Sequence, residues 1–141
     1  MKIIQILLIF GAIALGYVVP DLVKSISQEA EPISLDKYCM VSTTACQQDG
    51  VTITLEHDLA KPLVESMIEV NWEDTTSDTL LLSLQGFEMD MGIAKYQLTK
   101  QSSGRYIGNI MLPVCTQEKM TWIGTLTDGN KEVYAAIRME R

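Results

Sequence analysis

The sequence predicts an all-β protein, an antiparallel β-sandwich of about seven strands that follows an N-terminal transmembrane helix. Short segments alternate apolar and polar residues with a period of two, which is the spacing of a strand with one buried face. Turn residues such as Asp49-Gly50 and Asp128-Gly129 separate these segments at regular intervals, as they do in β-sandwiches. Beyond residue 24, no segment repeats its apolar residues with helical spacing. The chain therefore has room for one β domain of about 100 residues.

Residues 1–24 form the first predicted element, a membrane anchor or signal. Residues 3–19 are apolar apart from Gln5, and Lys2 precedes them. This run is near the short end of the roughly 17 to 25 residues that span a bilayer. The only Ala-x-Ala pattern, Ala12 to Ala14, lies inside the run, so we favour an uncleaved single-pass anchor over a cleaved signal peptide. On either reading the rest of the chain is exported, and an uncleaved anchor would keep Lys2 in the cytoplasm.

A polar linker over residues 25–33 leads to the exported domain, residues 34–141. Cys39 and Cys46 lie close together at its start, whereas Cys115 stands alone far downstream. In an oxidising compartment, the simplest arrangement is a Cys39–Cys46 disulfide with a free thiol at Cys115. Three cysteines also allow two other single bridges.

The strands are predicted in order from their alternation. Residues 51–57, Val-Thr-Ile-Thr-Leu-Glu-His, show the pattern most clearly. Trp72 and Trp122 each fall on a predicted strand, and we expect both in the core. The seven predicted strands cover residues 51–57, 67–72, 80–84, 95–100, 105–111, 121–126 and 133–139.

Charge and histidine content exclude several functions. The net charge is −7, with 11 basic and 18 acidic residues, and no basic stripe is present to bind nucleic acid or anionic lipid. His57 is the one histidine, so no Ser-His-Asp constellation is convincing, and Cys115 has no base near it in sequence. We therefore expect no nucleic-acid partner and predict that the protein is not an enzyme.

Sulfur atoms define the predicted functional site. Met89 and Met91 flank one residue in a turn between two glycines, and Met120 follows Cys115 by five residues. Thioethers and thiolates are soft ligands that suit Cu(I) better than Zn(II), Mg(II) or Ca(II). A blue-copper centre also needs two histidines, and the chain has only His57. We therefore predict a Cu(I) site made by Met89, Met91, Cys115 and Met120.

A second interpretation of the same residues needs no metal. Methionine fills irregular gaps in a core, and Cys115 could be a buried residue or part of a disulfide. On this interpretation the domain is an interaction module that docks a membrane protein complex through an exposed strand edge or loop. The two hypotheses differ in whether the four sulfur atoms meet at one partly open point.

The stretch from Gly86 to Leu126 resembles the FixH-like and YtkA-like group of exported domains. The resemblance rests on Met89-Asp90-Met91-Gly92, on Gly104-Arg105-Tyr106-Ile107-Gly108 and on Trp122 two residues after Met120. It implies a cupredoxin-like or immunoglobulin-like sandwich in the bacterial inner membrane, with the C-terminal domain in the periplasm. It also implies a role in copper handling or respiratory oxidase assembly, with a copper-containing oxidase or a copper-trafficking protein as partner. The residues to which it points are Met89, Met91, Met120 and Cys115.

Overall fold

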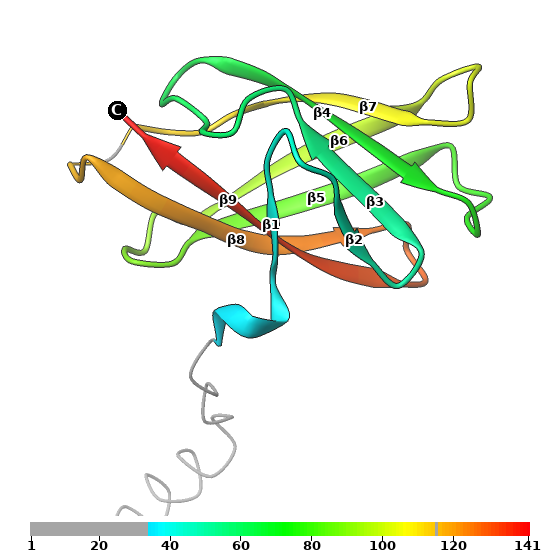
Figure 1. Cartoon of the computed structure of the whole chain (residues 1–141), viewed down its shortest axis with the longest axis horizontal. Helices are drawn as coiled ribbons and strands as arrows, with labels where there is room; N and C mark the ends of the chain where they lie inside the picture. The colour runs from blue at the N-terminus through cyan, green and yellow to red at the C-terminus, as the bar shows by residue number, and fades with distance from the viewer. Residues whose placement is uncertain (1–33, 115) are drawn as a thin grey trace, which may run out of the picture. The chain divides into compact units, whose positions relative to one another are not determined.

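The computed structural model describes residues 34–114 and 116–141 (Figure 1). The predicted anchor, the predicted linker and Cys115 lie outside these residues. Within them, no helix is long and apolar enough to cross a membrane. The described elements are a short 3-10 helix η1 (Leu35–Lys37) and the strands β1 (Cys39–Val41), β2 (Cys46–Gln48), β3 (Val51–Leu55), β4 (Glu65–Trp72), β5 (Thr79–Gly86), β6 (Ile93–Lys100), β7 (Tyr106–Met111), β8 (Lys119–Thr127) and β9 (Glu132–Glu140).

The described strands form one mixed sheet that curls nearly into a barrel (Figure 1). Their order is β1-β9-β8-β5-β6-β7-β4-β3-β2. Neighbours pair antiparallel except for β1 and β9, which run parallel with Cys39 opposite Ala135. The two edge strands, β1 and β2, follow one another in sequence, so the curled sheet brings its own edges together.

The all-β class is confirmed, and each of the seven predicted strands overlaps one of β3 to β9. The predicted strand count and the uniformly antiparallel pairing are wrong. β1 and β2 were not predicted, because a strand of three residues is too short to show an alternating pattern. The strands also join in one continuous sheet, whereas a sandwich of two sheets was expected.

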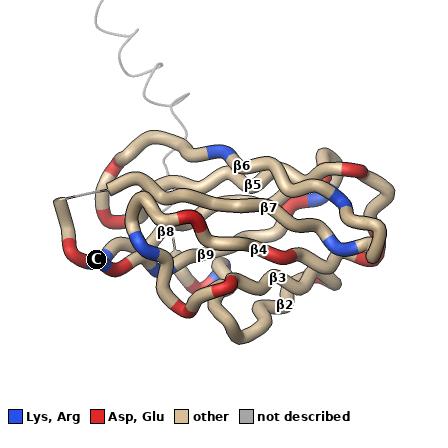
Figure 2. Tube along the Cα trace, turned by 90° about the horizontal axis from the view of Figure 1, so that it is seen from above, with Lys and Arg blue, Asp and Glu red and all other residues tan. Residues whose placement is uncertain are grey.

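Alternating side chains of the strands fill the interior of the sheet. In β4, Ser66, Ile68, Val70 and Trp72 are buried, and the residues between them are exposed or half-buried. Trp122 in β8 is fully buried, so both tryptophans lie in the core as predicted. Charged residues are spread over loops and strands along the trace (Figure 2).

The two edges of the sheet are joined at a seam between β1 and β2. The predicted Cys39–Cys46 disulfide is confirmed, with 5.9 Å between the two Cα atoms. The side chain of Gln48 adds two hydrogen bonds, because its Oε1 accepts from the Tyr134 backbone N–H at 2.7 Å and its Nε2 donates to the Lys37 carbonyl at 3.2 Å. The seam thus links β2 to β9 and to the chain ahead of β1.

Candidate functional site

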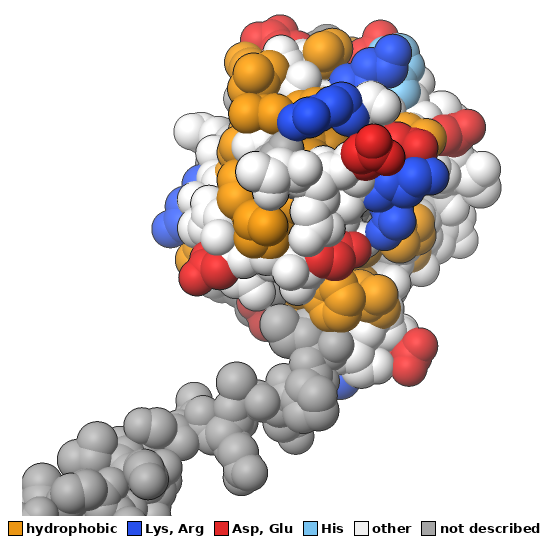
Figure 3. Space-filling model, turned by 90° about the vertical axis from the view of Figure 1, so that its left-hand side faces the viewer, with side chains coloured by type: hydrophobic (Ala, Val, Ile, Leu, Met, Phe, Trp, Pro, Cys, Tyr) orange, Lys and Arg blue, Asp and Glu red, His pale blue; other side chains and the backbone are white. Residues whose placement is uncertain are grey.

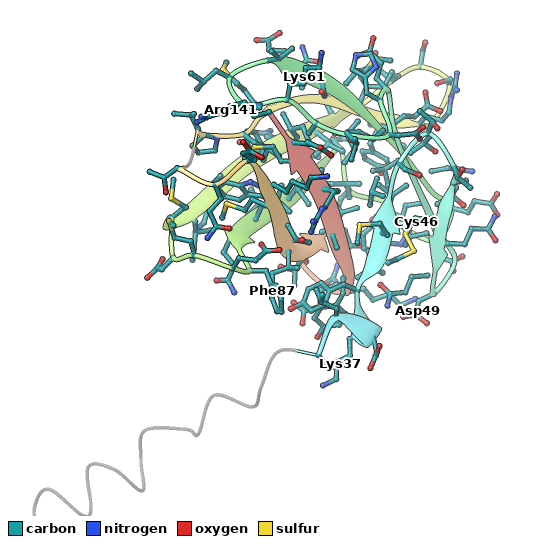
Figure 4. All side chains as sticks on the ribbon, turned by 60° about the vertical axis from the view of Figure 1, so that its left-hand side comes forward. Lys37, Cys46, Asp49, Lys61, Phe87 and Arg141 are labelled. Carbon is teal, nitrogen blue, oxygen red and sulfur yellow. A yellow bond between two sulfur atoms is a disulfide. The ribbon has the colours of Figure 1, made fainter. Side chains whose placement is uncertain are left out.

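Three loop segments meet at one end of the sheet and line an open pocket of about 490 Å³. We call it the sulfur pocket. The β5–β6 turn contributes two methionines, the segment between β7 and β8 contributes two residues, and the last residue of the chain completes the lining; these residues are Met89, Met91, Val114, Thr116 and Arg141. Arg141 and Phe87, which starts the turn, are labelled in Figure 4.

The β5–β6 turn is held in place by hydrogen bonds to β8. The Phe87 N–H donates to the Thr121 carbonyl at 2.9 Å. In return, the Glu88 carboxylate accepts from the Thr121 backbone N–H at 2.7 Å and from its hydroxyl at 2.8 Å. Arg138 Nη1 lies 2.6 Å from the Thr121 hydroxyl and 3.4 Å from the Glu88 carboxylate. This network fixes the turn just ahead of both methionines.

The same network shifts the titration of Glu88. Partial burial acts to raise the pKa of its carboxyl group, but the two hydrogen bonds from Thr121 and the charge of Arg138 outweigh burial and lower the pKa below its usual value. Because the pKa of Glu88 is lowered, its carboxylate is ionised at neutral pH and can accept the hydrogen bonds that hold the turn.

Close packing beneath the turn requires glycine at position 86. A Cβ added to Gly86 would collide with the Met89 carbonyl and with the terminal methyl group of Met120. The turn ends at Gly92, where φ is +73°, a conformation that L residues rarely adopt. The Gly92 N–H donates to the Asp90 carboxylate at 3.0 Å. The two glycines therefore determine how the Met89–Met91 segment lies against the sheet.

The structure brings together two of the four predicted copper ligands. Met89 and Met91 are half-buried against the core and both line the sulfur pocket. Met120 is fully buried in β8, and its methyl group packs against Gly86 rather than lining that pocket. Cys115 lies outside the described residues, but its sequence neighbours Val114 and Thr116 both line the pocket.

The donor set of the described lining suits a soft metal ion. Met89 and Met91 are the lining residues with sulfur, and thioether sulfur is a ligand for Cu(I). Among the described residues, no three or more His, Cys, Asp or Glu side chains cluster as a site for harder ions. The side chain of Arg141 also lines this pocket.

Four residues of this region were not predicted from the sequence: Glu88, Val114, Thr116 and Arg141. The signal for Glu88 was its place beside the Met-x-Met turn, but nothing in the sequence indicated that β8 would pass under that turn. Arg141 lies in the site because its N–H donates to the Glu118 carbonyl at 2.9 Å, which ties the chain end to the segment before β8. Such long-range pairings cannot be inferred from local pattern.

Comparisons of the chain with protein-family models, with curated proteins and with solved structures gave no match. The resemblance to the FixH-like and YtkA-like group therefore stays a prediction that rests on the residues quoted for it.

Proposed function

We propose that the protein binds Cu(I) through thioether and thiol sulfur at the sulfur pocket and passes it on within a copper-handling or oxidase-assembly pathway. The observation that supports the proposal most is that Met89 and Met91 line one open pocket together with both sequence neighbours of Cys115. Two thioethers from one turn and a thiol from a second loop would give a set of soft ligands.

The character of the pocket supports exchange of metal rather than permanent storage. The pocket is open to solvent and its methionines are only half-buried. Thioethers are neutral and bind weakly compared with a closed set of thiolates, so the ion could leave toward a partner. Met120 remains a predicted fourth ligand, and its full burial means that it would have to move to reach an ion in the pocket.

The proposal includes a location in the cell and a class of partner. An N-terminal anchor would hold the domain on the periplasmic side of a bacterial inner membrane, and a relation to cupredoxin-like or immunoglobulin-like domains would fit the copper role. The partner would be a copper-containing oxidase or a copper-trafficking protein. The disulfide at Cys39–Cys46 supports an oxidising compartment, because structural disulfides persist there and are rare in the cytosol.

Competition titration tests the proposal. The full chain, purified in detergent with Cys115 reduced, is titrated anaerobically with Cu(I) against a chromophoric chelator. Wild type is expected to bind one equivalent. A Met89→Leu/Met91→Leu variant is expected to weaken binding by at least roughly tenfold, a change of about 1.4 kcal/mol, because leucine keeps the packing and removes the sulfur.

The matched control is Met67→Leu/Met111→Leu, which changes two exposed methionines that do not line the sulfur pocket. It is expected to bind Cu(I) like wild type. Equal losses in both double variants, or no binding by wild type, would contradict the proposal.

A metal-free interaction module is the second candidate, and one observation favours it. Large apolar side chains that are 40% to 62% exposed gather in the β3–β4 loop and on the adjoining ends of β4 and β7; they are Leu59, Leu63, Val64, Met67 and Met111. Figure 3 shows that hydrophobic side chains are exposed on one face of the domain. Exposed apolar groups that cluster are typical of surfaces that bind another protein.

Site-directed photocrosslinking in membranes tests this candidate. A photoreactive residue at Leu63 is expected to give a discrete crosslinked product, and one at Leu81, which is 40% exposed on another part of the surface, is expected to give none. Crosslinking that is equal at both positions would contradict a specific docking surface. The crosslink should persist in the Met89→Leu/Met91→Leu variant if docking is independent of metal.

A further inference from the structure

A second pocket, of about 300 Å³, lies beneath the β3–β4 loop and shares no lining residue with the sulfur pocket. We call it the donor pocket. Two aliphatic side chains and three hydrogen-bond donors line it; they are Leu59, Val64, His57, Lys61 and Ser66. Lys61 is labelled in Figure 4, on the upper part of the domain.

The loop over the donor pocket, residues 56–64, is fixed at two points. The Ala60 N–H donates to the Arg138 carbonyl at 2.9 Å, and the Glu140 N–H donates to the Ala60 carbonyl at 3.1 Å. The Leu63 N–H donates to the Leu112 carbonyl at 2.9 Å. These bonds hold Leu63 at a φ of +59°, which is costly for a leucine and persists only where the surroundings enforce it. The pocket is therefore preformed, as ligand pockets usually are.

Ser66 provides an observation that points to a ligand. It lies on the inward face of β4 and is 1% exposed. Its hydroxyl has no hydrogen-bond partner among the described residues. Buried hydroxyl groups in native proteins are nearly always paired, because an unpaired one has lost its bonds to water without replacement. A ligand acceptor in the pocket would supply the missing partner.

The other two donors are also unengaged. Within the described residues, the side chains of Lys61 and His57 form no hydrogen bond or ion pair. The two acidic residues that flank His57 in sequence bond to other groups. The Glu56 carboxylate accepts from the Met67 N–H at 3.1 Å. The Asp58 carboxylate accepts from the Thr43 backbone N–H and hydroxyl. The polar part of the lining thus offers three groups that can donate a hydrogen bond, and the Lys61 ammonium among them carries a full positive charge.

We propose that the donor pocket binds a small organic carboxylate with a short aliphatic chain. A carboxylate accepts hydrogen bonds at both oxygens, so the Lys61 ammonium, the His57 ring N–H and the Ser66 hydroxyl can all donate to it. Leu59 and Val64 supply apolar walls for the chain. An inorganic anion would satisfy the donors but leave these walls unused, and an aliphatic amine would place like charge beside Lys61.

Nuclear magnetic resonance titration of the full chain with butyrate tests the proposal. Saturable shifts are expected at Lys61, Val64 and Ser66, with much weaker shifts on addition of inorganic phosphate and none with butylamine. Lys61→Gln is expected to weaken butyrate binding by at least about tenfold, as loss of a charge-assisted hydrogen bond does. Ser66→Ala should also weaken it, and Lys95→Gln, an exposed lysine in β6, should not.

Two outcomes would overturn the assignment. One is that the butyrate shifts do not saturate, or that Lys61→Gln weakens butyrate binding no more than Lys95→Gln does. The other is equal affinity for phosphate and butyrate, which would remove the role of the aliphatic walls. Neither outcome bears on the copper proposal, because the two pockets share no residue.

Discussion

Gln48 and Tyr134, which are 86 positions apart in the chain, are joined by a 2.7 Å hydrogen bond from the Tyr134 backbone N–H to the Gln48 side-chain oxygen. The bond connects β2 to β9 across the seam where the curled sheet meets itself. A side chain here takes the place of a backbone partner, because β2 ends the strand order and does not pair with β9. The near-closure of the sheet therefore depends on side chains as well as on backbone pairing.

Removing this side chain should loosen the seam. Gln48→Ala leaves the half-buried Tyr134 N–H without its acceptor, and we expect a loss of about 1 kcal/mol in the free energy of unfolding. Urea titration measures it. Gln47→Ala is the matched control, because Gln47 is exposed and should leave the free energy nearly unchanged. Equal stability of Gln48→Ala and Gln47→Ala would argue against a role for Gln48 in closing the seam.

The Cys39–Cys46 disulfide should stabilise the folded domain more than the Gln48 hydrogen bond does. Cys39 and Cys46 are seven positions apart, and a closed loop of that size is expected to stabilise the domain by about 2 to 3 kcal/mol. We expect a Cys39→Ala/Cys46→Ala variant to lose this amount of unfolding free energy and so to unfold at a lower urea concentration. Cys115→Ser is expected to unfold like wild type. If reduction of the wild type with a thiol left its unfolding midpoint unchanged, the bridge would not stabilise the seam.

The Glu88 network predicts a dependence of stability on pH. Because the pKa of Glu88 is lowered in the folded protein, its contribution is complete above the unfolded-state pKa of about 4.3 and is lost as pH falls through the folded pKa. We expect Glu88→Gln to cost about 1 kcal/mol at neutral pH. The difference from wild type should shrink below about pH 4.3. Thermal unfolding across pH measures it.

Glu73→Gln serves as the control for that series, since Glu73 lies in the exposed turn after β4 and belongs to no network among the described residues. If the stability lost in Glu88→Gln grew as the pH fell, the result would contradict stabilisation by the ionised Glu88 carboxylate.

Gly86 should tolerate no side chain. In Gly86→Ala the new methyl group would meet the Met89 carbonyl and the Met120 methyl, and we expect a loss of about 1 to 3 kcal/mol from overpacking. Thr79→Ala, at the exposed start of the same strand, is the control in thermal unfolding. A Gly86→Ala variant as stable as wild type would show that the turn can shift freely away from β8.

Much of the fold was accessible from the sequence because the longer strands carry their own pattern. In β3, Val51, Ile53 and Leu55 point inward and the threonines between them lie partly exposed, which is the alternation that predicted the strand. The parallel pairing of β1 with β9 was not accessible, since it joins residues about a hundred positions apart and depends on how the whole sheet curls.

The candidate site was accessible only in part. Met89 and Met91 could be identified because soft ligands in a glycine-bounded turn are chemically distinctive. The burial of Met120 follows from its inward position in β8, next to Trp122 in the alternation, and a correct strand register would have predicted it. The donor pocket could not be predicted, because His57, Lys61 and Ser66 meet only after the β3–β4 loop is tied to β9.

The most direct test of the copper proposal follows the methionine methyl groups themselves. Carbon-13 labelling of every methionine methyl group in the full chain gives one reporter for each of the eight methionines. On anaerobic addition of one equivalent of Cu(I), we predict large shifts at Met89 and Met91, and none at Met67 or Met111. A shift at Met120 would add it as a ligand. Shifts at Met67 and Met111 alone, or no shift at Met89 and Met91, would contradict Cu(I) binding at the sulfur pocket.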